Sequence, residues 1–320
     1  MQKYLFIALC VLSACVSDTD FDSSVPVTIL HMEDLYEANP DSVSLEYMAE
    51  EYGYFWEVYR QYIIALPNDA SFADSLRAFQ DNEDYQEAYQ QLKRIFNDYE
   101  ALELKAAIQR YHHHFSTKII PQVITFYGGF NYPVVATDSV LGVGLELFLG
   151  KESKYYEALA QKYPPYMHQQ FQPDYLSALA MKGWLDTEFP LPSQNFLAQM
   201  VHQGRVQYVL SQLLPNASDS VLMGYSKAQT EWCEGSEFAI WQFLVEQELL
   251  YSTDQMLIVK YMNPAPNTRG MPEESPGRVV AWVGWQIVNA YMHRHPETSL
   301  QALMKLQDAQ YILNESKYKP

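Results

Sequence analysis

The order of four segments between residues 123 and 242 limits the possible folds more than any other part of the sequence. Residues 123–127 and 142–149 are short, β-branched or aromatic runs of strand length. Residues 194–214 and 234–242 instead carry apolar residues at helical spacing. Helical patterns also dominate the chain on both sides of this stretch. We therefore predict a predominantly helical α+β fold with a small sheet packed against helices.

The first of these helices carries the sequence His202-Gln203-Gly204-Arg205-Val206. A catalytic zinc helix needs two imidazoles at positions i and i+4, and a Glu to activate the bound water. Strands, a helix with His-Glu-x-x-His and then a helix with a third ligand follow one another in zinc metallopeptidases. The stretch resembles that order, but only the first imidazole is present. The resemblance implies a zincin-like core with a degenerate active-site helix.

Taken residue by residue, this resemblance places the first metal ligand at His202, the general base at Gln203, the second ligand at Val206 and the third at Glu237. An amide cannot accept a proton as a carboxylate does, and valine cannot bind a metal. One imidazole and one carboxylate are too few for a tight zinc site. We therefore expect no catalytic residue, no bound metal and no cofactor. The alternative is an exported metal-dependent peptidase with rearranged ligands.

A degenerate site of this kind must still satisfy Glu237, because a buried carboxylate without a partner costs several kcal/mol. Arg205 lies three residues beyond His202, on nearly the same helix face. Arg278 is the first residue of a helix predicted over residues 278–295. We expect one of the two arginines, Arg205 first and Arg278 second, to pair with Glu237 as a structural clasp. For Arg278, a solvated surface charge is an equally good interpretation.

The amino terminus has the pattern of a signal peptide, with basic Lys3 followed by the apolar run Tyr4–Leu12. This run is too short to span a bilayer core of about 30 Å. The ending Leu-Ser-Ala-Cys15 resembles the lipobox of bacterial lipoproteins, in which the cysteine is acylated and becomes the new terminus. We predict a signal peptide at 1–14, a lipidated flexible tether at 15–26 and a single domain at 27–320. An ordinary secretory signal with a chance cysteine is the alternative.

Charge and cysteine content restrict the partners and the covalent structure. The chain has 21 basic and 39 acidic residues and a net charge of −18, which disfavours nucleic acid and anionic lipid headgroups as electrostatic partners. Cys10 lies in the predicted leader and Cys15 would carry lipid, so Cys233 has no cysteine left to pair with. We expect Cys233 to be a buried small hydrophobic residue.

Two further features fit more than one interpretation. In a metallopeptidase-like sheet, the predicted strand over residues 141–149 borders the substrate cleft and its edge can take up an extended peptide. Its glycines, Gly142 and Gly144, equally fit a bulge or a crowded strand crossing. The run His112–His114 is expected to have a surface or packing role, because consecutive helical residues point about 100° apart.

Short motifs spread along the chain carry a family resemblance: Tyr127–Phe130, Gly142–Gly150, Gly204-Arg205, Trp232-Cys233 before Glu237–Trp241, Pro276–Arg278, Gly284–Ile287, Tyr291-Met292 and Asn314–Pro320. Together and in this order, they resemble the gliding-motility lipoprotein family GldB over essentially the whole mature chain. The resemblance implies an envelope protein of gliding bacteria that is required for cell movement and has no established enzymatic activity. Its expected partners are the bilayer, through acylated Cys15, and other proteins of the gliding or secretion machinery. The residue after Cys15 is Val16 and not Asp, which by the sorting rule of enteric lipoproteins favours the outer membrane over the inner one.

Overall fold

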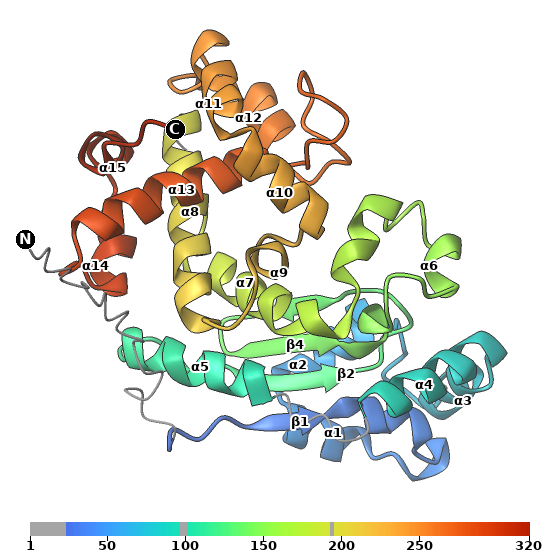
Figure 1. The fold of residues 1–320 in the computed structure, drawn as a ribbon. Helices are drawn as coiled ribbons and strands as arrows, with labels where there is room; N and C mark the ends of the chain where they lie inside the picture. Colours follow the sequence, from blue (N-terminus) through green and yellow to red (C-terminus); the bar gives the residue numbers. More distant parts are fainter. Residues whose placement is uncertain (1–23, 97–101, 193–194) are drawn as a thin grey trace, which may run out of the picture.

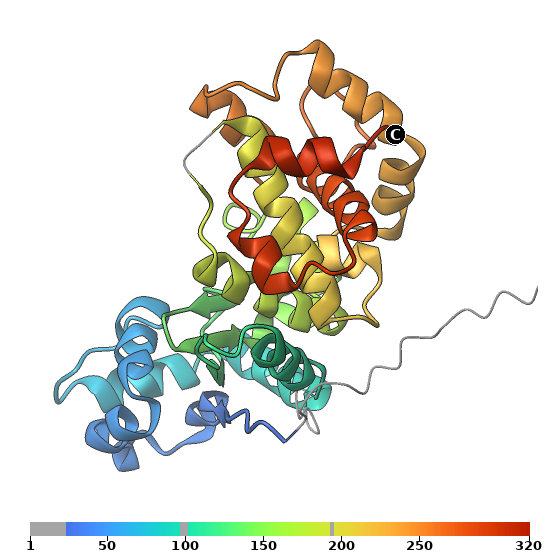
Figure 2. The same cartoon turned by 90° about the vertical axis from the view of Figure 1, so that its left-hand side faces the viewer.

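The computed structural model describes residues 24–96, 102–192 and 195–320. The predicted signal peptide, Cys15 and most of the predicted tether lie outside these residues. A small sheet has the first helices of the chain on one side and the helices of the carboxyl-terminal half on the other (Figure 1, Figure 2). The predicted predominantly helical α+β fold is confirmed. Within the described parts of the chain, no helix has the length and apolar character needed to cross a bilayer.

The sheet has four strands in the spatial order β1 (Ile29–His31), β2 (Gln122–Phe126), β4 (Val140–Gly144) and β3 (Val134–Ala136). The first three strands in this order are parallel, and β3 is antiparallel to β4. β2 and β4 are buried on both faces, which explains why their sequences are continuously apolar and do not alternate. β1 was not predicted, because three residues carry too weak a pattern.

One face of the sheet is covered by the first helices of the chain. Ile124 and Phe126 of β2 pack there against Phe55 and Tyr59 in a compact apolar cluster. The first helical elements that follow β1 lie on this side of the sheet. They are η1 (Met32–Glu37), η2 (Pro40–Ser42), α1 (Leu45–Tyr52), α2 (Tyr54–Val58), the π-helical turn η3 (Tyr59–Ile63) and α3 (Phe72–Gln80).

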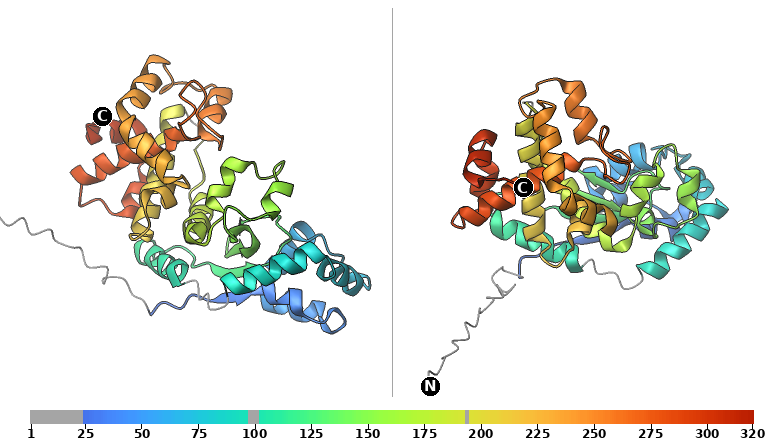
Figure 3. Two further views of the ribbon diagram at one scale, coloured as in Figure 1. Left: turned by 45° about the vertical axis from the view of Figure 1, so that its right-hand side comes forward. Right: turned by 45° about the horizontal axis from the view of Figure 1, so that its top comes forward.

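The opposite face carries the main core, to which β2 contributes Val123 and β4 contributes Leu141 and Val143. This core continues into the helical lobe that Figure 3 shows above the sheet. The remaining elements are α4 (Glu83–Ile95), α5 (Leu102–His114), η4 (Leu145–Phe148), α6 (Tyr155–Ala158), η5 (Pro165–Gln170), η6 (Pro173–Tyr175), α7 (Leu176–Glu188), α8 (Phe196–Leu213), α9 (Asp219–Met223), α10 (Lys227–Gly235), α11 (Glu237–Glu246), α12 (Gln255–Met262), α13 (Val279–Arg294), α14 (Leu300–Lys305) and α15 (Ala309–Ser316).

The crossing of α8 and α13 is the most extensive contact between two helices. It is possible because each helix has a glycine at the crossing point. A Cβ atom on Gly204 would lie 2.1 Å from the carbonyl oxygen of Gly284, and one on Gly284 would lie 2.1 Å from the carbonyl oxygen of Met200. A glycine inside a helix indicates that a neighbouring group lies very close to it. For Gly204, that neighbour is the backbone of α13.

Three details of the predicted elements are corrected. β4 lies between β2 and β3, so it has no free edge for a peptide. It ends at Gly144 and not at residue 149, and its glycines mark crowding: a Cβ on Gly142 would lie 2.4 Å from the ring of Phe55. The sequence pattern over residues 300–313 predicts one helix, whereas the structure has two, because Asp308 begins α15 by accepting a hydrogen bond from the Tyr311 N–H.

Candidate functional site

His202 lies on α8 and is buried, with hydrogen bonds at both ring nitrogens. Nδ1 lies 3.0 Å from Nη2 of Arg205, and Nε2 lies 2.9 Å from the carbonyl oxygen of Phe189 at the end of α7. A guanidinium can only donate, so Nδ1 accepts and the ring proton sits on Nε2, which donates to Phe189. Burial, followed by the positive charge of Arg205, lowers the pKa of His202 to about 4. The ring is therefore neutral at pH 7, and the lone pair on Nδ1 accepts the hydrogen bond from Arg205.

The two other positions that the metallopeptidase resemblance assigns to α8 face different surroundings. Val206 is buried in the main apolar core, while Gln203 is partly exposed. Neither side chain offers a carboxylate or an imidazole to a metal beside His202. No group of three or more His, Cys, Asp and Glu residues suited to a metal ion occurs in residues 24–96, 102–192 and 195–320.

Among the described residues, Arg205 binds backbone carbonyls and His202 but no carboxylate. Its Nη1 donates to the carbonyl oxygens of Leu303 and Met304, each at 3.3 Å, and to that of Leu306. These carbonyls lie at the carboxyl-terminal end of α14, where the Leu303 carbonyl also accepts the Leu306 N–H, and where the last carbonyls of a helix lack partners within it. Burial lowers the pKa of Arg205 to about 10, far above neutral pH. Arg205 is thus a positively charged cap that joins α8 to α14.

The expected pairing of Glu237 with an arginine is wrong. Glu237 is the first residue of α11 and is only partly buried, and its Oε1 accepts a hydrogen bond of 2.9 Å from the Tyr318 hydroxyl. None of the ion pairs found in the part of the chain that the structure describes joins Glu237 to Arg205 or Arg278. The reason is packing: α11 contacts α10 and α13, and the helix that crosses α8 is α13.

Arg278 lies at the start of α13 in a left-handed conformation, with φ of 59°. Its Nη2 donates to the carbonyl oxygen of Met223 at 3.1 Å. The turn before it is fixed because the Tyr225 hydroxyl donates to the Gly277 carbonyl at 2.9 Å. A Cβ on Gly277 would lie 2.2 Å from the carbonyl oxygen of Ala265, so this position requires glycine.

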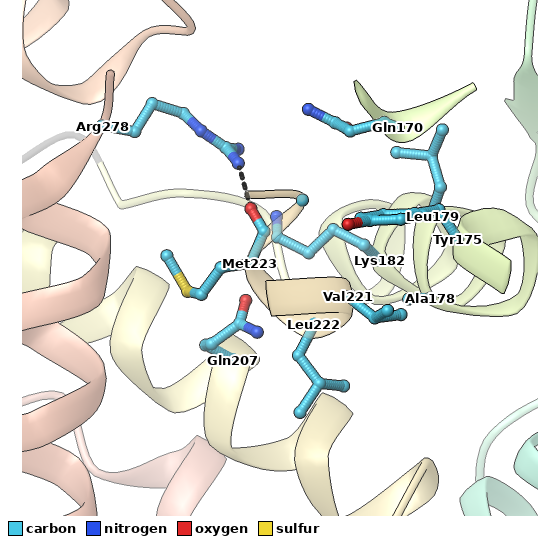
Figure 4. A pocket seen from close by; sticks show the side chains of 11 residues that line it. Gln170, Tyr175, Ala178, Leu179, Lys182, Gln207, Val221, Leu222, Met223 and Arg278 are labelled. Atoms are coloured by element: carbon cyan, nitrogen blue, oxygen red, sulfur yellow. Dashed lines mark hydrogen bonds between the residues drawn. The ribbon is translucent and has the colours of Figure 1, made fainter. Parts of the chain in front are cut away.

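Arg278 is one wall of a small pocket between α7, α8, α9 and the start of α13 (Figure 4). Lys182 of α7 is the second cationic group that lines it, and Nζ of Lys182 lies 2.6 Å from Oδ1 of Asp186. Burial lowers the pKa of Lys182. The amides of Gln170 and Gln207 also line the pocket. Gly224 leaves room for Gln170, since a Cβ there would lie 2.7 Å from the Gln170 amide carbon.

A buried carboxyl group that the sequence patterns do not predict, Glu146, lies in η4, the turn that follows β4. Its Oε1 accepts hydrogen bonds from the backbone N–H groups of Gly128, at 2.8 Å, and Phe130, at 2.9 Å. Its Oε2 is buried and has no hydrogen-bond partner within the described ranges. Burial raises the pKa of Glu146 to about 7, although the two N–H groups oppose this shift. The signal in the sequence was a single acidic residue inside the apolar run Leu145–Leu149.

The remaining predicted residues are confirmed or fall outside the structure. Cys233 is fully buried, and burial raises the pKa of its thiol to about 12, as expected for a small hydrophobic residue. His112–His114 form the last turn of α5. Cys15 lies outside the described residues.

Comparison with protein-family models gives one result. The model described as gliding motility protein GldB matches residues 16–320. Comparisons with curated proteins and with solved structures found no match.

Proposed function

The chain belongs to the GldB family of gliding motility proteins, and we propose that it is a lipid-anchored protein that binds partners in the gliding or secretion machinery without catalysing a reaction. Family membership makes it a gliding-motility lipoprotein associated with the cell envelope. The proposal adds three points: Cys15 as the site of the anchor, a facing toward the periplasm with the outer membrane favoured, and a role in binding or assembly.

The state of His202 is the observation that carries the non-catalytic part of this proposal. A zinc ligand must offer a lone pair, and the free lone pair of this imidazole accepts the Arg205 hydrogen bond. Metal binding would require His202 to give up Arg205, or to lose the proton that it donates to Phe189. Gln203 and Val206 supply neither a base nor a second ligand. We therefore interpret the zinc-peptidase likeness of this helix as that of an inactive descendant.

A membrane fractionation combined with a motility assay tests both parts. Cys15→Ala removes the thiol that would carry lipid, so we expect the variant to leave the membrane fraction and to lose motility. His202→Gln and Glu237→Gln keep hydrogen-bonding groups at their positions but remove the imidazole and the carboxylate. Both should stay in the membrane and support motility.

Two outcomes would contradict the proposal. A Cys15→Ala protein that still fractionates wholly with membranes would exclude Cys15 as the anchor. Loss of motility in His202→Gln and Glu237→Gln, with normal amounts of folded, membrane-bound protein, would indicate that these side chains take part in a reaction.

A further inference from the structure

The pocket beside α8 has an unusual lining for a protein of this charge. The chain carries a net charge of −18, yet Lys182 and Arg278 both line this small hollow. The guanidinium of Arg278 and the ammonium of Lys182 approach it from opposite elements, α13 and α7 (Figure 4). Asp186 binds Lys182 and offsets its charge, so Arg278 supplies one excess positive charge. The pocket therefore suits a ligand with one negative charge.

A buried amide of α8 points to the same ligand. Gln207 is 4% exposed, lines the pocket, and has an Nε2 atom without a hydrogen-bond partner in the described structure. A buried donor left unsatisfied lowers stability, so its retention is explained when something else supplies the acceptor. Nε2 itself has almost no exposed surface, so the amide must turn over before this donor faces the pocket, where an anionic oxygen would then be its acceptor.

The size of the pocket limits what can enter it. Its volume is about 40 Å³, and one water molecule needs about 10–15 Å³. A carboxylate group fits such a space, whereas a nucleoside or a sugar ring does not. A phosphate dianion fits less well, because its second charge would find no further unpaired cation.

Two further hollows continue from the pocket toward the surface. The first shares Gln170, Gly224 and Arg278 with it, and the second shares Tyr166 and Gln229 with the first. The second hollow is open to solvent and is much larger, about 500 Å³. A ligand that ends at Arg278 can therefore extend outward past the amides of Gln170 and Gln229, which are suitable partners for a peptide backbone. The outermost hollow is also lined by the carboxylates of Glu152, Glu273 and Glu274, which favour a peptide with positively charged residues ahead of its carboxylate.

We propose that this pocket binds the carboxylate of a peptide, with Arg278 and Lys182 as the cations, Gln207 as a neutral donor, and the outer hollows as the channel for the residues that precede the carboxylate. This inference rests on the proposed binding role of the protein, because it supplies the chemistry by which a partner would be recognised. It does not depend on lipidation of Cys15 or on the zinc content, so a negative result here would leave those two parts of the proposed function standing.

The probes for the test are acetyl-glycyl-glycine, its carboxyl-terminal amide, and inorganic phosphate. Binding to the mature lipoprotein in detergent micelles is followed by ligand-observed NMR. We expect the acid to bind at least about tenfold more tightly than the amide, because a hydrogen bond to a charged group is worth about 1.5–3 kcal/mol. We also expect phosphate to bind more weakly than the acid.

Three variants separate a binding site from a packing feature. Arg278→Gln should weaken binding of the acid about tenfold or more, while Arg278→Lys, which keeps the charge, should restore part of it. Gln207→Leu should weaken binding about fivefold without lowering the melting temperature, because it removes an amide that is unsatisfied in the free protein. Equal binding of acid and amide, tighter binding of phosphate than of the acid, or unchanged affinity in Gln207→Leu and Arg278→Gln would each overturn the proposal.

Discussion

Nη2 of Arg205 lies 3.0 Å from Nδ1 of His202, one turn earlier on the same helix. The pair connects α8 to the ends of two other helices, since His202 donates to Phe189 after α7 and Arg205 donates to carbonyls at the end of α14. Helix carboxyl termini leave carbonyls unsatisfied, and here two side chains of one helix satisfy them. The position that the metallopeptidase resemblance assigns to a metal ligand is thus occupied by a structural link.

Arg205→Met should destabilise the protein by about 3 kcal/mol, because the apolar stem is kept while the buried carbonyls and His202 lose their donor. Chemical denaturation measures this loss. Arg269→Met is the matched control, since Arg269 is exposed, and it should change stability by less than about 0.5 kcal/mol. Equal effects in the two variants would show that the Arg205 bonds contribute nothing.

Gly204→Ala should destabilise the protein although alanine favours helices by about 1 kcal/mol over glycine. The added Cβ would lie 2.1 Å from the Gly284 carbonyl oxygen, so α8 and α13 must move apart, at a cost of about 2 kcal/mol or more. Gly235→Ala is the control, because Gly235 lies in α10, where an added Cβ would have no neighbouring atom within 4 Å, and the change should be neutral or stabilising. A stable Gly204→Ala protein would mean that the helices do not cross at these glycines.

Glu146 gives stability a pH dependence of known sign. Its pKa is about 7 in the folded protein against 4.5 for an unperturbed Glu, so between these values the folded state holds the proton more tightly. Its contribution is therefore full below about pH 4.5, declines above it and is lost as the pH passes about 7. The total is on the order of 3 kcal/mol.

Comparison with Glu146→Gln isolates this contribution. His202 titrates in the opposite direction over part of the same range, because its pKa is lowered, but it is common to both proteins and cancels in their difference. The variant, measured by denaturation from pH 4.5 to 8, should gain stability relative to the natural protein as the pH rises. A difference that is constant with pH would show that Glu146 is not buried as described.

The elements with long, regular patterns could be predicted from sequence, and their partners could not. α8 and α13 lie close to their predicted ranges because the spacing of apolar residues reports local geometry, and β2 does so because its short run is β-branched and aromatic. The pairing of Glu237 was predicted wrongly because it depends on which helix crosses α8, and Tyr318 lies 81 residues away in the chain. Glu146 was missed for a similar reason, since its burial follows from the turn at Gly128.

The zinc content of the mature lipoprotein, purified in detergent without chelators and dialysed, tests the central claim most directly. Because both nitrogens of His202 are engaged and Val206 and Gln203 cannot act as ligand or base, elemental analysis should find far less than one zinc per chain, and the sample should hydrolyse no peptide. One zinc per chain that survives dialysis, and is lost in both His202→Gln and Glu237→Gln, would contradict the account and assign these two residues as ligands.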